Sequence, residues 1–458
     1  MKGRLSDAAA ATGGRLAGSD ADFSGVSIDS RTLERGQLFF ALRGERFDGH
    51  AFVVGAGEKG AAAAVVEHAL DCAVPQIVVG DSQAALTALA RAWRRRSKAV
   101  VIGVGGSNGK TTTKEMLAGI LGGAGPTLAT SGNLNNHIGV PLTLLRLEPM
   151  HRFAVVEMGA NHPGEIAALA ALAAPAIALV TNAGDEHLEG FGDLAGVAHA
   201  EGEMYAALPP TGTAVINADD PFNELWRTMS RGRRIVRFGV DAPAEARAIA
   251  IQGRVEAGDF VTNFTLDLAG EQARVRLGLA GRHNVSNALG AAGAAHAAGV
   301  GLPVIVAGLE RVRTVAGRLQ LKAGPRGSWL IDDSYNANPS SVRAGIDVLC
   351  ALPGEHWLVL GEMAELGGET VSSHAAIGDY ARRAGVTRLF ALGEAARHAL
   401  AAFGARGGWY EDGARLGDAL AAGLDAGVTV LIKGSRINRL ERVVERLLQP
   451  LAAAGNGN

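Results

Sequence analysis

The stretch between Ala99 and Glu115, AVVIGVGGSNGKTTTKE, holds the residues whose types and spacing point most directly to chemistry. An apolar run gives way to glycines, and Lys110 with a series of threonine hydroxyls follows. This order predicts a strand, a glycine loop and a helix, because backbone N–H groups and the positive end of a helix bind phosphate oxygens. Lys110 would contact the β- and γ-phosphates of a nucleotide, and the Thr111 hydroxyl would hold Mg²⁺.

The loop departs from the usual phosphate-binding motif at its first glycine. Gly103 and Gly109 enclose five residues, whereas the standard spacing has about four. An ordinary tight turn between strand and helix is the alternative interpretation, but a lysine beside several hydroxyls is unusual in such a turn. We expect a nucleotide to bind the loop residues Gly106, Ser107, Asn108, Gly109, Lys110, Thr111 and Thr112.

Polar groups follow two further apolar runs, at the positions where an open parallel sheet exposes its chemistry. Glu157 follows the run Phe153–Val156, and a carboxylate there is the expected second protein ligand of Mg²⁺ beside a phosphate-binding loop. The alternative for Glu157 is a helix cap or a surface group. His187 lies among acids after the run Ile177–Val180. We favour a metal or phosphate role for His187 over a structural one.

Three other groups of polar residues carry weaker signals. Ser30 and Arg31 belong to a polar cluster that suits an anion or a nucleotide sugar, with a plain surface loop as the alternative. Asp333 follows an apolar run and could contact ribose hydroxyls or form an acidic turn. The segment KGSR, from Lys433 to Arg436, suits a ligand that bears a carboxylate, or is simply a positively charged loop.

Apolar runs alternate with helical stretches through most of the chain, which predicts an α/β protein with mostly parallel sheets. The length suggests about three domains. We place a small α/β domain at residues 1–98, a central P-loop domain at 99–313 and a further α/β domain at 314–458. Residues 247–280 alternate apolar and polar side chains, which is typical of added antiparallel strands.

The composition fits a globular protein without a strong charge bias. Of the 458 residues, 48% are hydrophobic and 20% are charged, and the net charge of −2 gives no field that favours nucleic acid. The two cysteines, Cys72 and Cys350, argue against a disulfide framework and fit a reducing compartment. No segment reads as a signal peptide or a membrane span. We expect a cytoplasmic monomer that binds no nucleic acid and inserts into no membrane.

Together these residues predict a phosphoryl-transfer enzyme that depends on ATP and Mg²⁺. Neither a Ser/His/Asp nucleophile pattern nor a dinucleotide-binding GxGxxG motif with its acidic partner is evident. The acceptor of the phosphoryl group does not follow from the residues themselves.

Across nearly the whole chain the motifs resemble one family, the Mur ligases, which form amide bonds with ATP in peptidoglycan precursor synthesis. The resemblance is greatest to the member that adds D-Ala-D-Ala to UDP-N-acetylmuramoyl-tripeptide. The segments GNLNN, GVPLTLL, HLEGFG and DDSYNANP carry this finer resemblance, and the DNPR-type motif of the diaminopimelate-adding relative is missing. The other matching segments are DSRTLERGQLFFAL, GSNGKTTTKEM, EMGANHPGEI, NADDP, GRHNVSNAL, GRLQ, LGEMAELG and KGSR.

The resemblance implies three domains: one for the UDP-sugar, a central ATPase, and a C-terminal Rossmann-like domain that binds the incoming dipeptide. It implies that the γ-phosphate of ATP goes to the terminal carboxylate of the tripeptide and gives an acyl phosphate. The amine of D-Ala-D-Ala then attacks and phosphate leaves, which completes the last cytoplasmic step of UDP-MurNAc-pentapeptide synthesis. Such a reaction depends mainly on positioning and on neutralising charge.

The resemblance also implies roles for individual residues. Lys110 and Thr111 would bind phosphate and Mg²⁺, and Glu157 and His187 would bind metal. Asn284 and Asn287 would hold adenine, and Arg318 and Asp333 would reach ATP. Ser30 and Arg31 would hold the UDP-sugar, and Asn133 and Asn136 would line the channel for the muramyl peptide. The loop with Lys433, Ser435 and Arg436 would lie near the dipeptide.

One position departs from the family pattern. Many Mur ligases carry a lysine fourteen residues beyond the metal-binding histidine, and its carbamylated amine helps to hold a second Mg²⁺. Glu201 stands at that position in this chain. We hypothesise that the Glu201 carboxylate replaces the carbamate, with Glu203 or His199 as alternatives. The contrary interpretation is that Glu201 faces solvent.

Two other functions stay open at this point. One is a different ligase of the same superfamily, such as a diaminopimelate- or lysine-adding enzyme or a folylpolyglutamate synthase, which the KGSR and DDSYNANP segments disfavour. The other is a nucleotide-dependent regulatory protein that hydrolyses ATP slowly. Phosphate release that needs both peptide substrates would separate the ligases from the regulatory protein.

Overall fold

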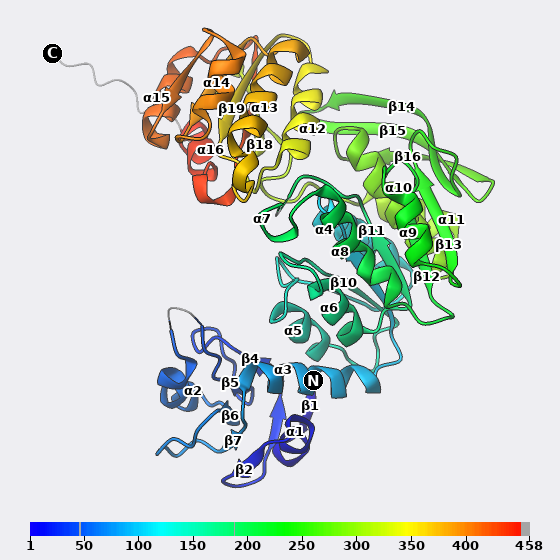
Figure 1. The fold of residues 1–458 in the computed structure, drawn as a ribbon, viewed down its shortest axis with the longest axis vertical. Coiled ribbons are helices and arrows are strands. Elements are labelled where there is room, and N and C mark those ends of the chain that lie inside the picture. Colours follow the sequence, from blue (N-terminus) through cyan, green and yellow to red (C-terminus); the bar gives the residue numbers. More distant parts are fainter. Residues whose placement is uncertain (45–46, 187, 450–458) are drawn as a thin grey trace, which may run out of the picture.

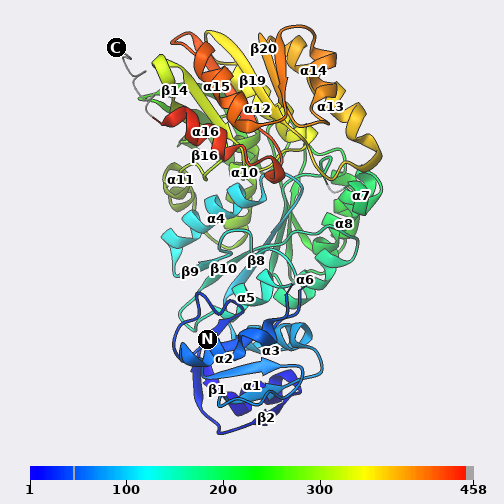
Figure 2. The same cartoon turned by 90° about the vertical axis from the view of Figure 1, so that its left-hand side faces the viewer.

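The computed structural model describes residues 1–44, 47–186 and 188–449. The described part forms three α/β domains that are stacked along the long axis, with the P-loop domain in the middle (Figure 1), and Figure 2 shows the same order from the side. Their main sheets have five, nine and six strands. The predicted fold class is therefore confirmed. Within these residues, no helix combines the length and apolarity needed to cross a bilayer.

The N-terminal domain is built on a sheet in the order β2-β7-β6-β5-β4, in which β2 is antiparallel to β7 and the other pairs are parallel. The strands are β2 (Arg15–Ala17), β4 (Val26–Ser27), β5 (Leu38–Phe40), β6 (Ala63–Val66) and β7 (Gln76–Val78), with a separate ribbon of β1 (Lys2–Arg4) and β3 (Asp22–Ser24). The helices are α1 (Leu5–Thr12), α2 (Val53–Glu58) and α3 (Ser82–Arg96).

The central sheet has the order β16-β15-β14-β13-β12-β11-β8-β10-β9. Strands β9 to β14 and β8 pair in parallel, and the last two pairs are antiparallel, which confirms the added antiparallel strands. The strands are β8 (Val100–Gly105), β9 (Thr127–Ala129), β10 (Phe153–Glu157), β11 (Ile177–Val180), β12 (Thr213–Asn217), β13 (Arg234–Gly239), β14 (Ala246–Glu256), β15 (Asp259–Leu268) and β16 (Glu271–Leu277).

Helices cover both faces of the central sheet, because its parallel strands are apolar on both sides. Along β8, Val101 packs into one apolar cluster and Ile102 into another, since successive side chains of a strand point to opposite faces. The helices are α4 (Lys110–Ala124), α5 (Gly139–Leu145), α6 (Glu165–Ala173), α7 (Leu188–Phe191), α8 (Leu194–Ala206), α9 (Asn223–Met229), α10 (Arg282–Ala297) and α11 (Leu302–Glu310).

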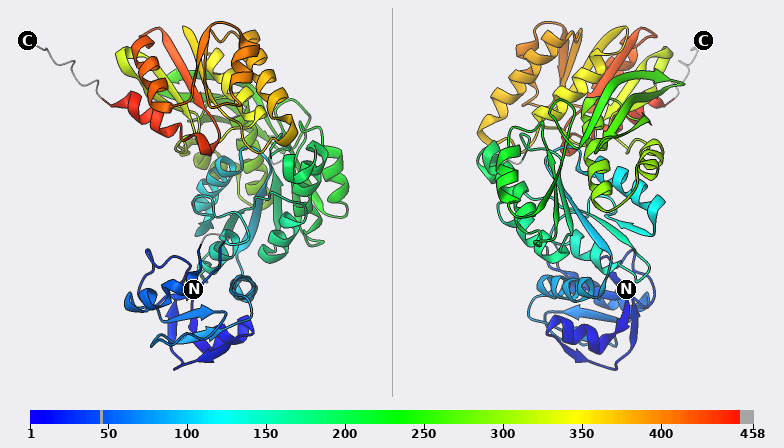
Figure 3. Two further views of the ribbon diagram at one scale, coloured as in Figure 1. Left: turned by 60° about the vertical axis from the view of Figure 1, so that its left-hand side comes forward. Right: turned by 90° about the vertical axis from the view of Figure 1, so that its right-hand side faces the viewer.

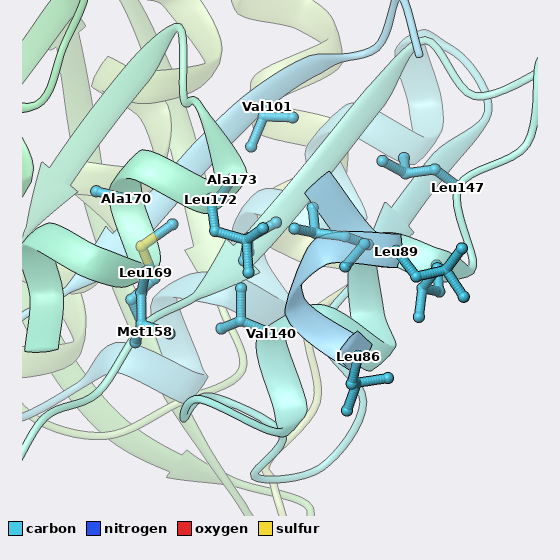
Figure 4. Close-up of a cluster of buried hydrophobic side chains, with 14 of the residues drawn as sticks. Leu86, Leu89, Val101, Val140, Leu147, Met158, Leu169, Ala170, Leu172 and Ala173 are labelled. Carbon is cyan, nitrogen blue, oxygen red and sulfur yellow. The ribbon is translucent and has the colours of Figure 1, made fainter. Parts of the chain in front are cut away.

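Helix α3 joins the N-terminal domain to the central one. It packs against α5 and α6, and Figure 4 shows its Leu86 and Leu89 in one apolar cluster with Val140 of α5. The guanidinium of Arg94 donates to the carbonyls of Ala173 (2.7 Å) and Ala174 at the C-terminal end of α6. The two domains are therefore joined both by a shared apolar core and by the hydrogen bonds of Arg94.

The C-terminal sheet has the order β17-β18-β22-β19-β20-β21 and is parallel except for β17. The strands are β17 (Gln320–Ala323), β18 (Trp329–Asp333), β19 (Glu355–Gly361), β20 (Arg388–Leu392), β21 (Gly407–Tyr410) and β22 (Val428–Lys433). The helices are α12 (Pro339–Cys350), α13 (Thr370–Ala384), α14 (Arg397–Phe403), α15 (Gly413–Gly423) and α16 (Glu441–Leu448).

The hairpin of β14 and β15 extends from the central sheet to the C-terminal domain (Figure 3). Phe260 of β15 belongs to the same apolar cluster as Ile331 of β18. The central and C-terminal domains therefore meet through packed apolar side chains.

Candidate active site

A cleft of about 720 Å³ is lined by the central and C-terminal domains and includes the glycine loop between β8 and α4. The structure brings most of the predicted site residues together here, although they come from distant parts of the sequence. Those that line the cleft are Ser107, Asn108, Gly109, Lys110, Thr111, Thr112, Asn133, Asn136, Glu157, Asn284, Asn287, Arg318, Asp333 and Lys433.

The glycine loop needs its glycines for two physical reasons. Gly106 and Gly109 have φ of +110° and +83°, a region that other residues rarely adopt. A Cβ atom on Gly109 would lie 2.3 Å from Asn287 Oδ1, and one on Gly106 would lie 2.2 Å from Thr181 Oγ1. The motif therefore reflects close packing against β11 and α10 as well as space for a phosphate.

Lys110 is the cation of this loop. Its Nζ donates to Glu186 Oε1 (3.0 Å) and to the carbonyl of Ser107 (3.1 Å). Burial by itself lowers the Lys110 pKa, but Glu186 and two further carboxylates outweigh it, so the pKa is raised. Those two carboxylates are Glu201 and Glu157. Lys110 is therefore a persistent positive charge at the start of α4, as phosphate binding requires.

The Glu157 carboxylate at the end of β10 is buried and only half satisfied. Its Oε1 accepts hydrogen bonds from Asn135 Nδ2 (3.0 Å) and from the Thr111 hydroxyl (3.3 Å), whereas Oε2 has no hydrogen-bond partner. A buried carboxylate oxygen without a partner is costly unless a cation meets it. This oxygen and the Thr111 hydroxyl are the kind of donors that Mg²⁺ prefers.

A metal ion beside Glu157 would find only part of its ligands among the described residues. Among them, no group of three or more His, Cys, Asp and Glu side chains is placed to hold one ion. His187, the predicted metal ligand, lies outside the described residues. An ion beside Glu157 would therefore take further oxygens from a bound nucleotide or from water.

Glu201 lies in α8, beneath the glycine loop, with 3% of its surface exposed. The interpretation that it faces solvent is therefore wrong. Its Oε2 accepts a hydrogen bond from the Gly106 N–H (2.7 Å). Burial raises the pKa of Glu201 to about 7, with Lys110 opposing and Glu186 adding to the rise. Glu201 does not line the cleft, so it faces the loop from behind.

We expect the Glu201→Gln variant to be more stable than the parent at pH 8 but not at pH 5. Above its folded-state pKa, the parent holds a buried carboxylate that the unfolded chain would solvate. The pKa of Glu201 is about 7 in the folded protein, against an ordinary 4.5. As pH rises from about 4.5 to about 7, the free energy of unfolding of the parent therefore falls relative to that of the variant, by on the order of 3 kcal/mol in total. Urea unfolding of both proteins from pH 5 to 8 measures this, and a pH-independent difference would contradict it.

Arg318 approaches the loop from the C-terminal side. Arg318 Nη2 donates to the Thr111 hydroxyl (3.2 Å), and its guanidinium lies 4.4 Å from the centre of the Tyr335 ring. The Arg318 Nε is buried without a partner. Arg318 therefore presents an unsatisfied donor and a positive charge beside the residue that would hold Mg²⁺.

Asp333 and Lys433 form a buried pair in the same cleft. Lys433 Nζ lies 2.6 Å from Asp333 Oδ2, and Asp333 Oδ1 accepts from the Leu319 N–H (3.2 Å). Burial raises the pKa of Asp333, while Lys433 opposes the rise. Asp333 thus fixes the segment that carries Arg318, and Lys433 belongs to the cleft wall.

Asn284 and Asn287 lie at the start of α10, on the cleft wall next to Gly109. Asn287 Nδ2 donates to Asn284 Oδ1 (3.1 Å), and Asn284 Nδ2 donates to the Ala280 carbonyl (2.8 Å). Both side chains are buried. These bonds hold the two amides in one orientation, which is what selective recognition of a base requires.

Comparison with known families matches three consecutive parts of the chain. Residues 22–94 match the Mur ligase family catalytic domain, residues 104–295 the Mur ligase middle domain, and residues 317–436 the Mur ligase glutamate ligase domain. The UDP-N-acetylmuramoyl-tripeptide–D-alanyl-D-alanine ligase of Escherichia coli K12 is 42% identical over 95% of this chain and 96% of its own length. The chain belongs to the Mur ligase family.

Solved structures of relatives agree with this membership. A crystal structure of MurF from Acinetobacter baumannii has a TM-score of 0.91 and 35% identity, and it covers 98% of this chain and 99% of its own. The MurF ligase from Thermotoga maritima in complex with ADP has a TM-score of 0.81 and 27% identity, over 92% of this chain and 96% of its own. The Mur ligase architecture therefore extends over all three domains.

Some predicted site residues of this Mur ligase lie away from the cleft lining. Arg31 is exposed and pairs with Asp29 (2.7 Å), and Ser30 is its neighbour in the N-terminal domain. Ser435 is buried, where its hydroxyl donates to the Ala337 carbonyl (3.1 Å). Arg436 is exposed and lies 3.4 Å from Glu441. Gly106 faces Glu201 behind the loop.

Three cleft residues have contacts that the sequence interpretation did not assign. Asn135 holds Glu157, and Tyr335 stacks on Arg318. Asn338 donates to Asn108 of the glycine loop (2.9 Å). All three belong to the segments GNLNN and DDSYNANP, so the motifs marked the right regions, but nothing in them says which amide faces which partner.

Proposed function

We propose that this Mur ligase joins D-alanyl-D-alanine to UDP-N-acetylmuramoyl-tripeptide in a reaction driven by ATP. The single observation that carries the proposal is the cleft, in which a phosphate-binding loop meets polar residues of a second domain. The high identity to the E. coli ligase over nearly the whole length of both chains supports the choice of substrates. We infer that the reaction is the last cytoplasmic step of UDP-MurNAc-pentapeptide synthesis, carried out by a monomer.

The reaction begins when the terminal carboxylate of the tripeptide attacks the γ-phosphorus of ATP. The bond from the γ-phosphorus to the bridging oxygen breaks, ADP leaves, and an acyl phosphate forms. The amine of D-Ala-D-Ala then attacks the acyl carbon, loses a proton and expels phosphate, which leaves the new amide. Lys110 and Arg318 supply the positive charge that the transferred phosphoryl group needs.

We further propose that Mg²⁺ binds at Glu157 and the Thr111 hydroxyl, with His187 as a third ligand. The orphaned Glu157 Oε2 is the feature that fits a cation. When bound, Mg²⁺ would neutralise phosphate charge and orient the nucleotide. Asn135 keeps the Glu157 carboxylate in place through Oε1, which leaves Oε2 free for the ion.

The remaining assignments are proposals of the same kind. Asn284 and Asn287 would hold adenine, and Asp333 would support the nucleotide. Residues 1–98 would hold the UDP-sugar with Ser30 and Arg31. Residues 99–313 would bind ATP, and Asn133 and Asn136 of this domain would line the channel for the muramyl peptide. Residues 314–458 would bring the dipeptide to the loop of Lys433, Ser435 and Arg436. From behind the loop, the Glu201 carboxylate would stand in for the carbamylated lysine through a bridging water. An unchanged Mg²⁺ requirement in Glu201→Gln would remove that idea.

The test is phosphate release and product mass with ATP, UDP-MurNAc-tripeptide and D-Ala-D-Ala. We expect release to require both peptide substrates and the product to carry two added alanines. Single amino acids in place of the dipeptide should give no product; a product with lysine or diaminopimelate would indicate another ligase of the superfamily. Phosphate release without the peptides would point instead to a regulatory ATPase.

A further inference from the structure

The glycine loop touches the C-terminal domain through a closed ring of hydrogen bonds. Asn108 Nδ2 donates to Ser340 Oγ (2.9 Å), which donates to Asn338 Oδ1 (3.1 Å). Asn338 Nδ2 donates back to Asn108 Oδ1 (2.9 Å). We propose that this ring, the Asn108 latch, locks the C-terminal domain onto the P-loop, so that Asn108 is a residue that positions one domain against the other.

The backbone of Asn108 is already satisfied within the central domain. Its N–H donates to Asn182 Oδ1 (3.0 Å), and its carbonyl accepts from Thr181 Oγ1 (2.7 Å) and Asn182 Nδ2 (2.9 Å). These bonds to the end of β11 fix the main chain of the loop. The side-chain amide therefore projects from a rigid base, and both of its polar atoms bond to the C-terminal domain.

The partner residues are equally well fixed by the N-terminus of α12. Asn338 is the N-cap: its Oδ1 accepts from the Ser341 N–H (2.8 Å), and its own N–H donates to Ser341 Oγ (3.0 Å). This capping box leaves Nδ2 as the donor for Asn108. Asn338 is 6% exposed, so an unmade bond there would leave a buried donor unsatisfied.

Two neighbouring features show how tightly the domains meet at this point. A Cβ atom on Gly184 would lie 2.8 Å from Asn108 Nδ2 and 3.0 Å from Ser340 Oγ, so that position has no room for a side chain. Arg318 contacts Thr111 on the other side of Lys110. A C-terminal domain that moves away from the latch must therefore give up both contacts with the loop.

The test is small-angle scattering of the full chain without ligands, for the parent and for variants on each side of the latch. Asn108→Ala removes the central-domain partner. Asn338→Ser keeps a good N-cap residue but removes the donor. Gly184→Ala adds a wedge. We expect the scattering profile of the parent to match the structure. Each variant should raise the ratio of open to closed molecules about tenfold, which increases the mean radius of gyration.

The controls separate a latch from a loss of fold. Ser372→Ala removes a serine hydroxyl near the start of α13 in the same domain, where it donates to the Glu369 carbonyl (3.0 Å) and not to the latch. This variant should stay as compact as the parent. The double variant Asn108→Ala, Asn338→Ser should expand no further than either single variant, because both remove the same interaction. Additive expansion, compact single variants or an expanded parent would each overturn the proposal.

The kinetic consequence rests on the proposed function. If the latch delivers the C-terminal domain, both single variants should lower kcat/KM for D-Ala-D-Ala about tenfold, and their effects should not add in the double variant. Scattering needs no turnover, so it decides on the latch even if the chain makes no pentapeptide. An expanded variant that keeps the parent's kcat/KM would overturn the role of Asn108 in catalysis.

Discussion

Replacing Lys110 by alanine is expected to lower the rate of amide formation by at least about 10³-fold at saturating substrates, because phosphoryl transfer relies on fixed positive charge at the γ-phosphate. Lys110 is the buried cation of the loop, and Glu186, Glu201 and Glu157 keep it protonated. Chromatographic measurement of the pentapeptide product gives the rate directly. A variant with the parent's rate would remove the P-loop from the mechanism.

A second variant guards against a trivial loss of structure. Lys110→Arg keeps the charge but replaces a compact ammonium by a wider guanidinium, and we expect it to recover only part of the activity. Lys110→Ala leaves three carboxylates without their shared cation, so its unfolding should be compared with that of the parent at pH 6 and pH 8. If Lys110→Ala unfolds like the parent but has lost its activity, the loss is due to the missing ammonium group and not to a loss of structure.

The second large effect is expected for Glu157→Gln, which should lower the rate about 10²-fold and raise the Mg²⁺ concentration for half-maximal rate at least about tenfold. Glutamine still offers an oxygen to Asn135 and Thr111, but it puts an uncharged amide where the orphaned Oε2 now lies. The variant therefore changes the charge while the volume stays nearly constant.

A binding measurement accompanies the kinetics. In the parent, Mg²⁺ should increase the thermal stabilisation that ADP confers, and Glu157→Gln should lose this increment. Glu165→Gln is the matched control, because Glu165, the first residue of α6, also lines the cleft, but its carboxylate already accepts from the Asn161 N–H (2.8 Å). If Glu157→Gln kept the parent's response to Mg²⁺, Glu157 would not be a metal ligand.

The parts of the site that the sequence predicted are those with a local signal. Lys110 and Thr111 follow a glycine run, and the loop in the structure bends at Gly106 and Gly109. Glu157 closes an apolar run and ends β10, beside β8 in the parallel sheet. Parallel strands place their carboxyl ends at one edge, so a strand-end residue can be located without a structure.

The partners of these residues had no such signal. Glu186 bonds to Lys110 across 76 positions, and Asn135 bonds to Glu157 across 22. Glu201 was predicted to be important from the family pattern, yet its place beneath Gly106 depends on how α8 packs against β8. Hydrogen bonds between residues so far apart in the sequence depend on how whole helices and strands pack. A short stretch of sequence does not contain that information.

Sequence reasoning sufficed for the α/β class, the mostly parallel sheets, the added antiparallel strands and the loop at the head of α4, because each follows from side-chain periodicity or from glycine geometry within a few neighbouring residues. The folded molecule was needed to show that Asn108 faces Asn338, that Glu201 lies behind the loop and that Arg318 contacts Thr111. Those contacts join residues up to 230 positions apart. Their geometry depends on how distant elements pack, within the central domain for Glu201 and between the central and C-terminal domains for Asn108 and Arg318.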